Sequence, residues 1–377
     1  MIYGVIVGFF IGIGFMIIAH NIDGVVENLP CRVVFGSGTL GAARAEVERL
    51  GGKRALVLTT PQQEAEGAKL GSALGPLYAG IFCGATMHTP VEVTGRALAA
   101  MGACEADCVV SLGGGSTTGL GKALALRTGV NQLCIPTTSA GSEMTPILGE
   151  TRDGLKTTVS DPAVLPETVI YDVDLTMTLP VSLTATSGIN AIAHAVEAPY
   201  ARDANPVTSL MAEEGIRVLV RALPAIAANS RDGDARTEAL YGAWLCGLCL
   251  GTVGMALHHK LCHSLGGTFD LPHAETHTIT LPHALAYNAP AVPDAMNRIA
   301  WAVGTTDAAQ GGLYDLAKRL NAKLALRDVG MPESGIDRAA DLAVTNSYWN
   351  PRPLKRNAIR DLIARAWAGK PPMPIAG

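Results

Sequence analysis

A histidine-rich stretch in the second half of the chain is the first candidate for chemistry. Positions 257–273 read "LHHKLCHSLGGTFDLPH" and contain four histidines. His259 and His263 are four residues apart, so a helix would place them on one face, while His258 points to another side. Imidazole is a frequent metal ligand and also titrates near neutral pH. The stretch therefore predicts either a metal site or an acid–base site.

A break in this helix would bring another histidine to the same place. We expect Gly266 and Gly267 to end the helix, so that the following loop carries His273. An earlier helical segment, "SGINAIAHAVEA", carries His194. A single histidine in an apolar helix is more often a core residue than a ligand. Together, however, His194, His259 and His273 are candidate imidazole ligands.

The residue four positions before His194 bears on whether an ion is held. A catalytic metal usually has a carboxylate beside such histidines, and the helix would present it at position 190. The residue there is Asn190. Its amide is neutral and a poor ligand for a divalent ion, which puts metal binding in doubt. A simpler alternative is that Asn190 only completes a local hydrogen-bond network.

Two glycine- and hydroxyl-rich turns indicate a nucleotide site. "SLGGGSTTGLGKA" and "PTTSAGSEMT" each follow an expected strand, and the first also opens a helix. Glycines allow close approach of a pyrophosphate, and free N–H groups at a helix start favour an anion. The first turn is neither GxGxxG nor a Walker motif. The candidate cofactor-binding residues are Gly113, Gly114, Gly115, Ser116, Thr117, Thr137, Thr138, Ser142, Lys156 and Thr60.

The end of an earlier strand predicts the choice of cofactor. "RALVLTT" ends in Thr59 and Thr60. A carboxylate there would hold the ribose hydroxyl and repel a 2′-phosphate. A threonine does neither, so we expect NADH to be used and NADPH to be tolerated.

Composition limits the class of protein. The chain has 377 residues, of which 48% are hydrophobic and 16% charged, with a net charge of -4. That is enough for a large core and two domains, and no basic stripe suggests nucleic acid. The 8 cysteines lack the two-pair spacing of a zinc site. We interpret them as reduced, buried thiols of a cytosolic protein.

The order of apolar segments predicts the fold. Short apolar runs alternate with helical patterns up to about Pro180, and long helical patterns follow. This predicts an α/β N-terminal domain, doubly wound with a mostly parallel, dinucleotide-binding sheet, and an all-α C-terminal domain. The expected boundaries are 1–24 for a hydrophobic extension, 25–179 for the α/β domain and 180–377 for the helical domain.

The first 19 residues carry no charge and are long enough to cross a bilayer at about 1.5 Å per residue. They lack a positive n-region and a cleavage site. A membrane anchor therefore stays an alternative, beside a later start at Met16. We expect a cytoplasmic protein, with membrane association as the alternative.

The quoted segments resemble the iron-containing (group III) alcohol dehydrogenase family. The usual ligand set of that family, an Asp and three His, has the spacing of Asn190, His194, His259 and His273. His263 matches a further active-site histidine near the nicotinamide, and the turns at 113–116 and 137–138 match its cofactor-binding turns. Residues 25–370 are most similar to the maleylacetate reductase branch, including "IPTTSAGSEMTPILGET" and "NPRPLKRNAIRDLIARAWAG". That branch is regarded as not needing a metal, which agrees with Asn190.

The resemblance implies reduction of the conjugated C=C of maleylacetate to 3-oxoadipate in aromatic degradation, with chlorinated analogues as further candidate substrates. It implies His263 as general acid or nicotinamide-side donor. His194, His259 and His273 would orient the substrate and stabilise an enolate, and Asn190 would donate its amide. Lys260 and Arg352 are hypotheses for the substrate carboxylates. A homodimer is expected. The alternatives are a metal-dependent alcohol or glycerol-type dehydrogenase and a membrane-tethered binding protein.

Overall fold

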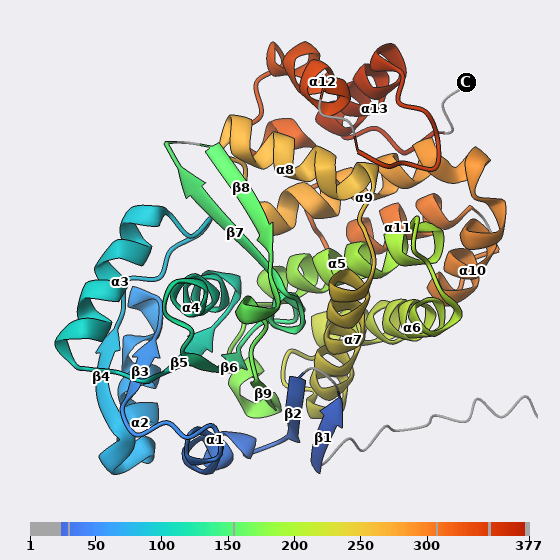
Figure 1. Ribbon diagram of the computed structural model, residues 1–377. Helices are drawn as coiled ribbons and strands as arrows, with labels where there is room; N and C mark the ends of the chain where they lie inside the picture. The colour runs from blue at the N-terminus through green and yellow to red at the C-terminus, as the bar shows by residue number, and fades with distance from the viewer. Residues whose placement is uncertain (1–23, 29–30, 154, 307, 346–347, 374–377) are drawn as a thin grey trace, which may run out of the picture.

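The N-terminal half is built on a seven-stranded sheet (Figure 1). In spatial order the strands are β1 (Gly24–Asn28), β2 (Cys31–Gly36), β9 (Thr168–Asp172), β6 (Asn131–Pro136), β5 (Cys108–Gly113), β3 (Ala55–Leu58) and β4 (Tyr78–Phe82). Strand β1 is antiparallel to β2, and the other neighbours are parallel. The mostly parallel sheet predicted from the sequence is confirmed.

The computed structural model describes residues 24–28, 31–153, 155–306, 308–345 and 348–373. The hydrophobic extension predicted at 1–24 lies outside the described residues except for Gly24, which begins strand β1. The boundaries set at 24 and 179 stay predictions. Within the described residues no single helix is long and apolar enough to cross a membrane.

Helices cover both faces of the sheet, as a doubly wound fold requires. They are α1 (Ala43–Arg49), α2 (Glu64–Leu74), α3 (Val91–Ala103) and α4 (Gly115–Thr128). Alternate residues of β3 point to opposite faces. Ala55 and Val57 pack with α1 and α2, whereas Leu56 and Leu58 pack with α3 and α4. The fully apolar run in β3 is therefore buried on both faces of the sheet, which is typical of a central parallel strand.

A two-stranded hairpin extends from the sheet domain toward the helical half (Figure 1). It consists of β7 (Ile147–Arg152) and β8 (Leu155–Ser160), paired antiparallel. Strand β8 contacts a helix of the C-terminal half. The sequence did not predict this hairpin, because its strands are largely polar and lack the apolar run of a sheet strand.

The second half is helical, as expected. Its helices are α5 (Val181–Glu197), α6 (Pro206–Ala228), α7 (Gly233–Thr252), α8 (Leu257–Phe269), α9 (His273–Asn288), α10 (Pro293–Val303), α11 (Ala309–Arg319), α12 (Gly335–Thr345) and α13 (Arg356–Ala368). Helix α5 is central and packs against α6, α7 and α9. Helix α8 follows α7 after a bend of 94°.

Two local predictions in this half were wrong. Gly266 and Gly267 do not end α8, which continues to Phe269 and stops at Asp270 with φ of 51°. His273 consequently lies in the first turn of α9 rather than in a loop. Two glycines cost a helix only about 2 kcal/mol together, and tertiary packing overrides that preference.

The two halves meet through a contact between glycine backbones. The turn after β6 contains Gly141, and helix α7 contains Gly247. A Cβ atom at Gly247 would overlap the carbonyl oxygen of Gly141, and a Cβ at Gly141 would lie 2.7 Å from the carbonyl oxygen of Ala243. Only glycine at both positions allows the helix to approach the turn this closely.

We predict that Gly247→Ala destabilises the protein by about 1–3 kcal/mol, because the added methyl forces helix and turn apart. The control is Gly95→Ala in α3, where no atom lies within 4 Å of the new Cβ. That substitution should stabilise the protein by about 0.5–1 kcal/mol. Urea unfolding of both variants measures the difference, and equal effects would contradict the close-contact argument.

Candidate active site

The first glycine turn lies at the carboxyl end of β5 and opens helix α4. Gly113 has φ of 148°, and a Cβ there would meet Gln63 Oε1 at 2.6 Å and Thr117 Oγ1 at 2.7 Å. A Cβ on Gly114 would meet the Thr138 side chain at 3.0 Å. Helix α4 begins at Gly115 without a side-chain cap. Its first N–H groups are thus left for an anionic ligand.

The second turn follows β6 and is held by a lysine that the sequence analysis missed. Lys122 is buried, and its Nζ donates to the carbonyl oxygens of Ser142 and Thr145, both at 2.7 Å, and of Ile147 at 3.0 Å. Burial lowers the Lys122 pKa to about 8. Ser142 Oγ is buried without a hydrogen-bond partner among the described residues. The turn that Lys122 holds in place therefore leaves the Ser142 hydroxyl for a ligand.

A glutamine links the ends of β3 and β6 by hydrogen bonds and lies close to Gly113 at the end of β5. Gln63 Nε2 donates to Thr137 Oγ1 at 3.1 Å, and Thr60 Oγ1 donates to Gln63 Oε1 at 3.3 Å. The structure thus brings together the predicted residues after β3, β5 and β6 at one edge of the sheet. Ser116 lies in the first turn of α4, half-buried. Lys156 lies in β8, and its side chain is outside the described part.

The histidines form one cluster between α5, α8 and α9. The ring centroids of His194 and His259 are 5.3 Å apart, and those of His259 and His263 are 6.5 Å apart. His273 lies 4.3 Å from His277, which lies 5.2 Å from His259. His277 is thus a member that the sequence analysis missed, although its four-residue spacing from His273 was a usable signal.

The sequence predicts that His258 points away from the other histidines, but the structure places its ring in this cluster. Its ring lies edge-on to His259, with centroids 5.1 Å apart, and its Nε2 is 3.0 Å from His277 Nδ1. The bend between α7 and α8 sets the direction of the first α8 turn, which the helical spacing alone does not show. Both faces of this turn therefore carry buried imidazoles.

A buried glutamate orients His259. Glu197 Oε2 is 2.7 Å from His259 Nδ1, and the carboxylate also accepts the backbone N–H groups of Ala256 and His258 at 3.0 Å. The Glu197 side chain has no exposed surface. The Glu197 carboxylate fixes the His259 ring so that Nε2 faces away from the carboxylate. The sequence signal for Glu197 was its spacing of three after His194 on one helix face.

Four polar atoms in this region lack partners among the described residues. They are Asn190 Oδ1, His194 Nδ1, His259 Nε2 and His277 Nε2, and all are buried. Burial, followed by the neighbouring His259 and His263, holds the pKa of His194 well below its ordinary value. Its ring is therefore neutral near pH 7. Unsatisfied buried polar atoms are costly, so this region fits a polar ligand.

The residues at the ligand positions implied by the family resemblance do not fit an iron ion. Position 190 offers a neutral amide where a carboxylate would be needed. Within the described chain, the His, Cys, Asp or Glu side chains whose ligand atoms all lie within 4.8 Å of one another are His258, Cys262 and His277. His194, His259 and His273 do not form such a group.

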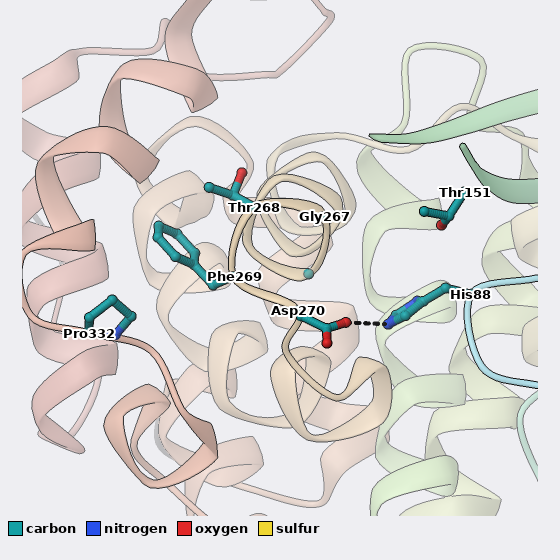
Figure 2. A pocket seen from close by; sticks show the side chains of 8 residues that line it. His88, Thr151, Gly267, Thr268, Phe269, Asp270 and Pro332 are labelled. Atoms are coloured by element: carbon teal, nitrogen blue, oxygen red, sulfur yellow. Dashed lines mark ion pairs between the residues drawn. The ribbon is translucent and has the colours of Figure 1, made fainter. Parts of the chain in front are cut away.

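A pocket of about 600 Å³ opens beside the C-terminal end of α8 (Figure 2). Gly266 and Gly267, one turn after His263, contribute to its wall. His88 of the sheet half reaches across toward Asp270, with Nε2 and Oδ1 3.8 Å apart.

The two residues suggested for the substrate carboxylates lie outside the lining of this pocket. Lys260 is exposed on α8, and Arg352 donates to the carbonyl oxygen of Tyr287 at 2.7 Å.

Comparison with known proteins gives two family matches. Residues 30–173 match the model for iron-containing alcohol dehydrogenase, and residues 184–367 match the C-terminal model of the same family. A maleylacetate reductase from Rhizobium sp. (strain MTP-10005) is 56% identical over 348 residues, covering 92% of this chain and 99% of that protein.

Solved structures agree with these matches. Maleylacetate reductase from Agrobacterium tumefaciens has a TM-score of 0.87 and 55% identity, and the match covers 93% of this chain and 99% of that one. Iron-containing alcohol dehydrogenase from Corynebacterium glutamicum has a TM-score of 0.84 and 43% identity, covering 90% and 95%. The expected fold is confirmed, and a binding protein without enzyme activity is not favoured.

We predict that Glu197→Gln lowers stability by about 1–3 kcal/mol, because the amide removes the charge that binds the His259 ring and the first α8 N–H groups. Thermal and urea unfolding measure the effect. The matched control is Glu66→Gln, at an exposed position in α2. A Glu197 variant as stable as this control would show that the carboxylate does not organise α8.

Proposed function

Because the chain belongs to the iron-containing alcohol dehydrogenase family of NAD(P)-dependent oxidoreductases, we propose that it reduces maleylacetate to 3-oxoadipate. The observation that carries this proposal is the 49–56% identity to several maleylacetate reductases over at least 90% of the chain. The donor is NADH, with NADPH tolerated. Chlorinated maleylacetates are further candidate substrates.

The reaction adds hydride to a polarised alkene. Maleylacetate contains a C=C bond conjugated to a ketone, with a carboxylate at each end. Hydride at the carbon β to the ketone leaves an enolate, and a proton at the α carbon completes the reduction. Because conjugation already spreads the developing charge onto the ketone oxygen, hydrogen-bond donors can stabilise it. A strong Lewis acid is less necessary here than for the oxidation of an alcohol.

The histidine cluster supplies the groups that this reaction needs. The Glu197 carboxylate accepts the Nδ1 proton of His259, so this ring donates from Nε2 to the enolate oxygen as the imidazolium, and His194 and His273 orient the substrate. His263, half-buried one turn before the pocket wall, is the general acid or the donor on the nicotinamide side. Asn190 donates its amide N–H to a substrate oxygen, which an aspartate could not do.

The cofactor is held by the glycine turns. When bound, the nicotinamide cofactor supplies the hydride. The N–H groups at the start of α4 bind its pyrophosphate, since Gly113 and Gly114 leave no side chain in the way. The hydroxyls of Thr60, Thr137, Thr138 and Ser142 and the residues Gly115, Ser116 and Thr117 complete the site, and Lys156 adds a positive charge.

No metal ion is required in this proposal. The neutral amide of Asn190 supports it, because the carboxylate that would anchor a divalent ion is replaced. We further propose that the protein is a cytoplasmic homodimer of an aromatic-degradation route. Its 8 free cysteines, six of them buried, agree with a reducing compartment.

We predict that purified protein oxidises NADH in the presence of maleylacetate and excess chelator. Turnover should depend on both substrates and persist after metal removal. The control is the same assay with a simple alcohol and NAD⁺, which should be far slower. Activity that disappears with chelator and returns with iron or zinc would contradict the metal-free reaction.

A further prediction concerns the variant Asn190→Asp. We expect kcat/KM for maleylacetate to fall by at least about tenfold, or about 1.4 kcal/mol, because a carboxylate repels the enolate and cannot donate to it. The matched control is Asn190→Ala, which removes the donor without adding charge and should lose less. An aspartate variant with unchanged kcat/KM would show that Asn190 does not face the substrate.

A further inference from the structure

A compact group of soft ligands lies beside the proposed substrate site. His258 and Cys262 are four residues apart on α8, and His277 faces them from α9. Cys262 Sγ lies 3.8 Å from His258 Nε2, which in turn lies 3.0 Å from His277 Nδ1. In a tetrahedral zinc site, bond lengths of about 2.0–2.3 Å place ligand atoms about 3.3–3.7 Å apart. These two distances are within a few tenths of an ångström of that spacing, and all three ligand atoms lie within 4.8 Å of one another.

The chemistry of the three side chains also suits a metal. All three are buried. A neutral imidazole offers a lone pair to a divalent ion. A thiolate with two imidazoles is a ligand set that zinc and its thiophilic analogues prefer.

The surroundings can balance the added charge. One divalent ion with one thiolate carries a net charge of +1. The Glu197 carboxylate, which accepts the backbone N–H of His258, is buried next to the group. Cys262 Sγ also lies 3.9 Å from the carbonyl oxygen of Thr276, so the thiol can point its proton away from the rings when no ion is bound. A buried ion here would not be left uncompensated.

We propose that His258, Cys262 and His277 form a buried binding site for one zinc ion or another thiophilic divalent ion. Binding releases the thiol proton of Cys262 to solvent. If His277 Nδ1 carries the proton shared with His258, that proton moves to His277 Nε2, which is unpartnered among the described residues; if His258 Nε2 carries it, the proton moves to His258 Nδ1. The ion links α8 to α9 and has no part in hydride transfer.

This inference is independent of the proposed reaction. It predicts that metal bound to the purified protein does not by itself indicate metal-dependent catalysis, because the ion sits behind the substrate-facing rings. Metal content and reductase activity should therefore separate. Removal of the ion should lower thermal stability while maleylacetate turnover at low temperature continues.

The test uses the full chain after treatment with chelator, titrated with Co²⁺. We expect one equivalent to bind with a near-ultraviolet thiolate-to-cobalt charge-transfer band, and Zn²⁺ to displace it. Bound Zn²⁺ should raise the melting temperature. Binding without the thiolate band, or no binding at micromolar metal, would overturn the proposal.

Two variants locate the ion. Cys262→Ser should lose the band and the thermal shift, whereas Cys249→Ser, a buried thiol outside the group, should keep both. If Cys262→Ser does not fold, His277→Gln provides the second variant and should weaken Co²⁺ binding at least tenfold. A band that persists unchanged in Cys262→Ser or in His277→Gln would assign the ion to another site.

Discussion

A buried carboxylate organises the helical half of the molecule. Glu197 has no exposed side-chain surface, and its ion-pair partner in the structure is His259. Burying a charge costs several kcal/mol unless hydrogen bonds and opposite charge offset it. Here the start of α8 supplies both, since its free N–H groups point at the carboxylate and its dipole favours a negative charge. The direction of α8, and with it the position of every histidine it carries, follows from this contact.

The two candidate ligand regions have different physical characters. At the sheet edge, close backbone approach and the Ser142 hydroxyl, which has no partner among the described residues, leave room for an anion, and little side-chain charge is involved. In the helical half, imidazole rings lie close together, and burial with the neighbouring rings holds the pKa values of His194, His258 and His277 below the ordinary value. The first arrangement suits recognition of a phosphate by fixed dipoles. The second suits groups that become charged only when a developing negative charge appears beside them.

The sequence predicted those parts whose cause is local. The strand β5 and the turn at Gly113 could be read directly, because an apolar run followed by glycines has one structural meaning in an α/β pattern. Glu197 and His277 could not be ranked above other helical residues. Their importance comes from a contact 62 residues away for Glu197 and 19 residues away for His277. The continuation of α8 through Gly266 and Gly267 likewise depends on packing rather than on propensity.

The contact between Gly141 and Gly247 has a consequence for how such sequences diverge. The two positions are 106 residues apart (247 − 141) and lie in different halves, yet neither accepts a side chain while the other retains its place. A change at one cannot be relieved by a smaller neighbour, because glycine is already the smallest residue. Both positions should therefore resist substitution together, and chains that keep one glycine but not the other should join their halves in a different way.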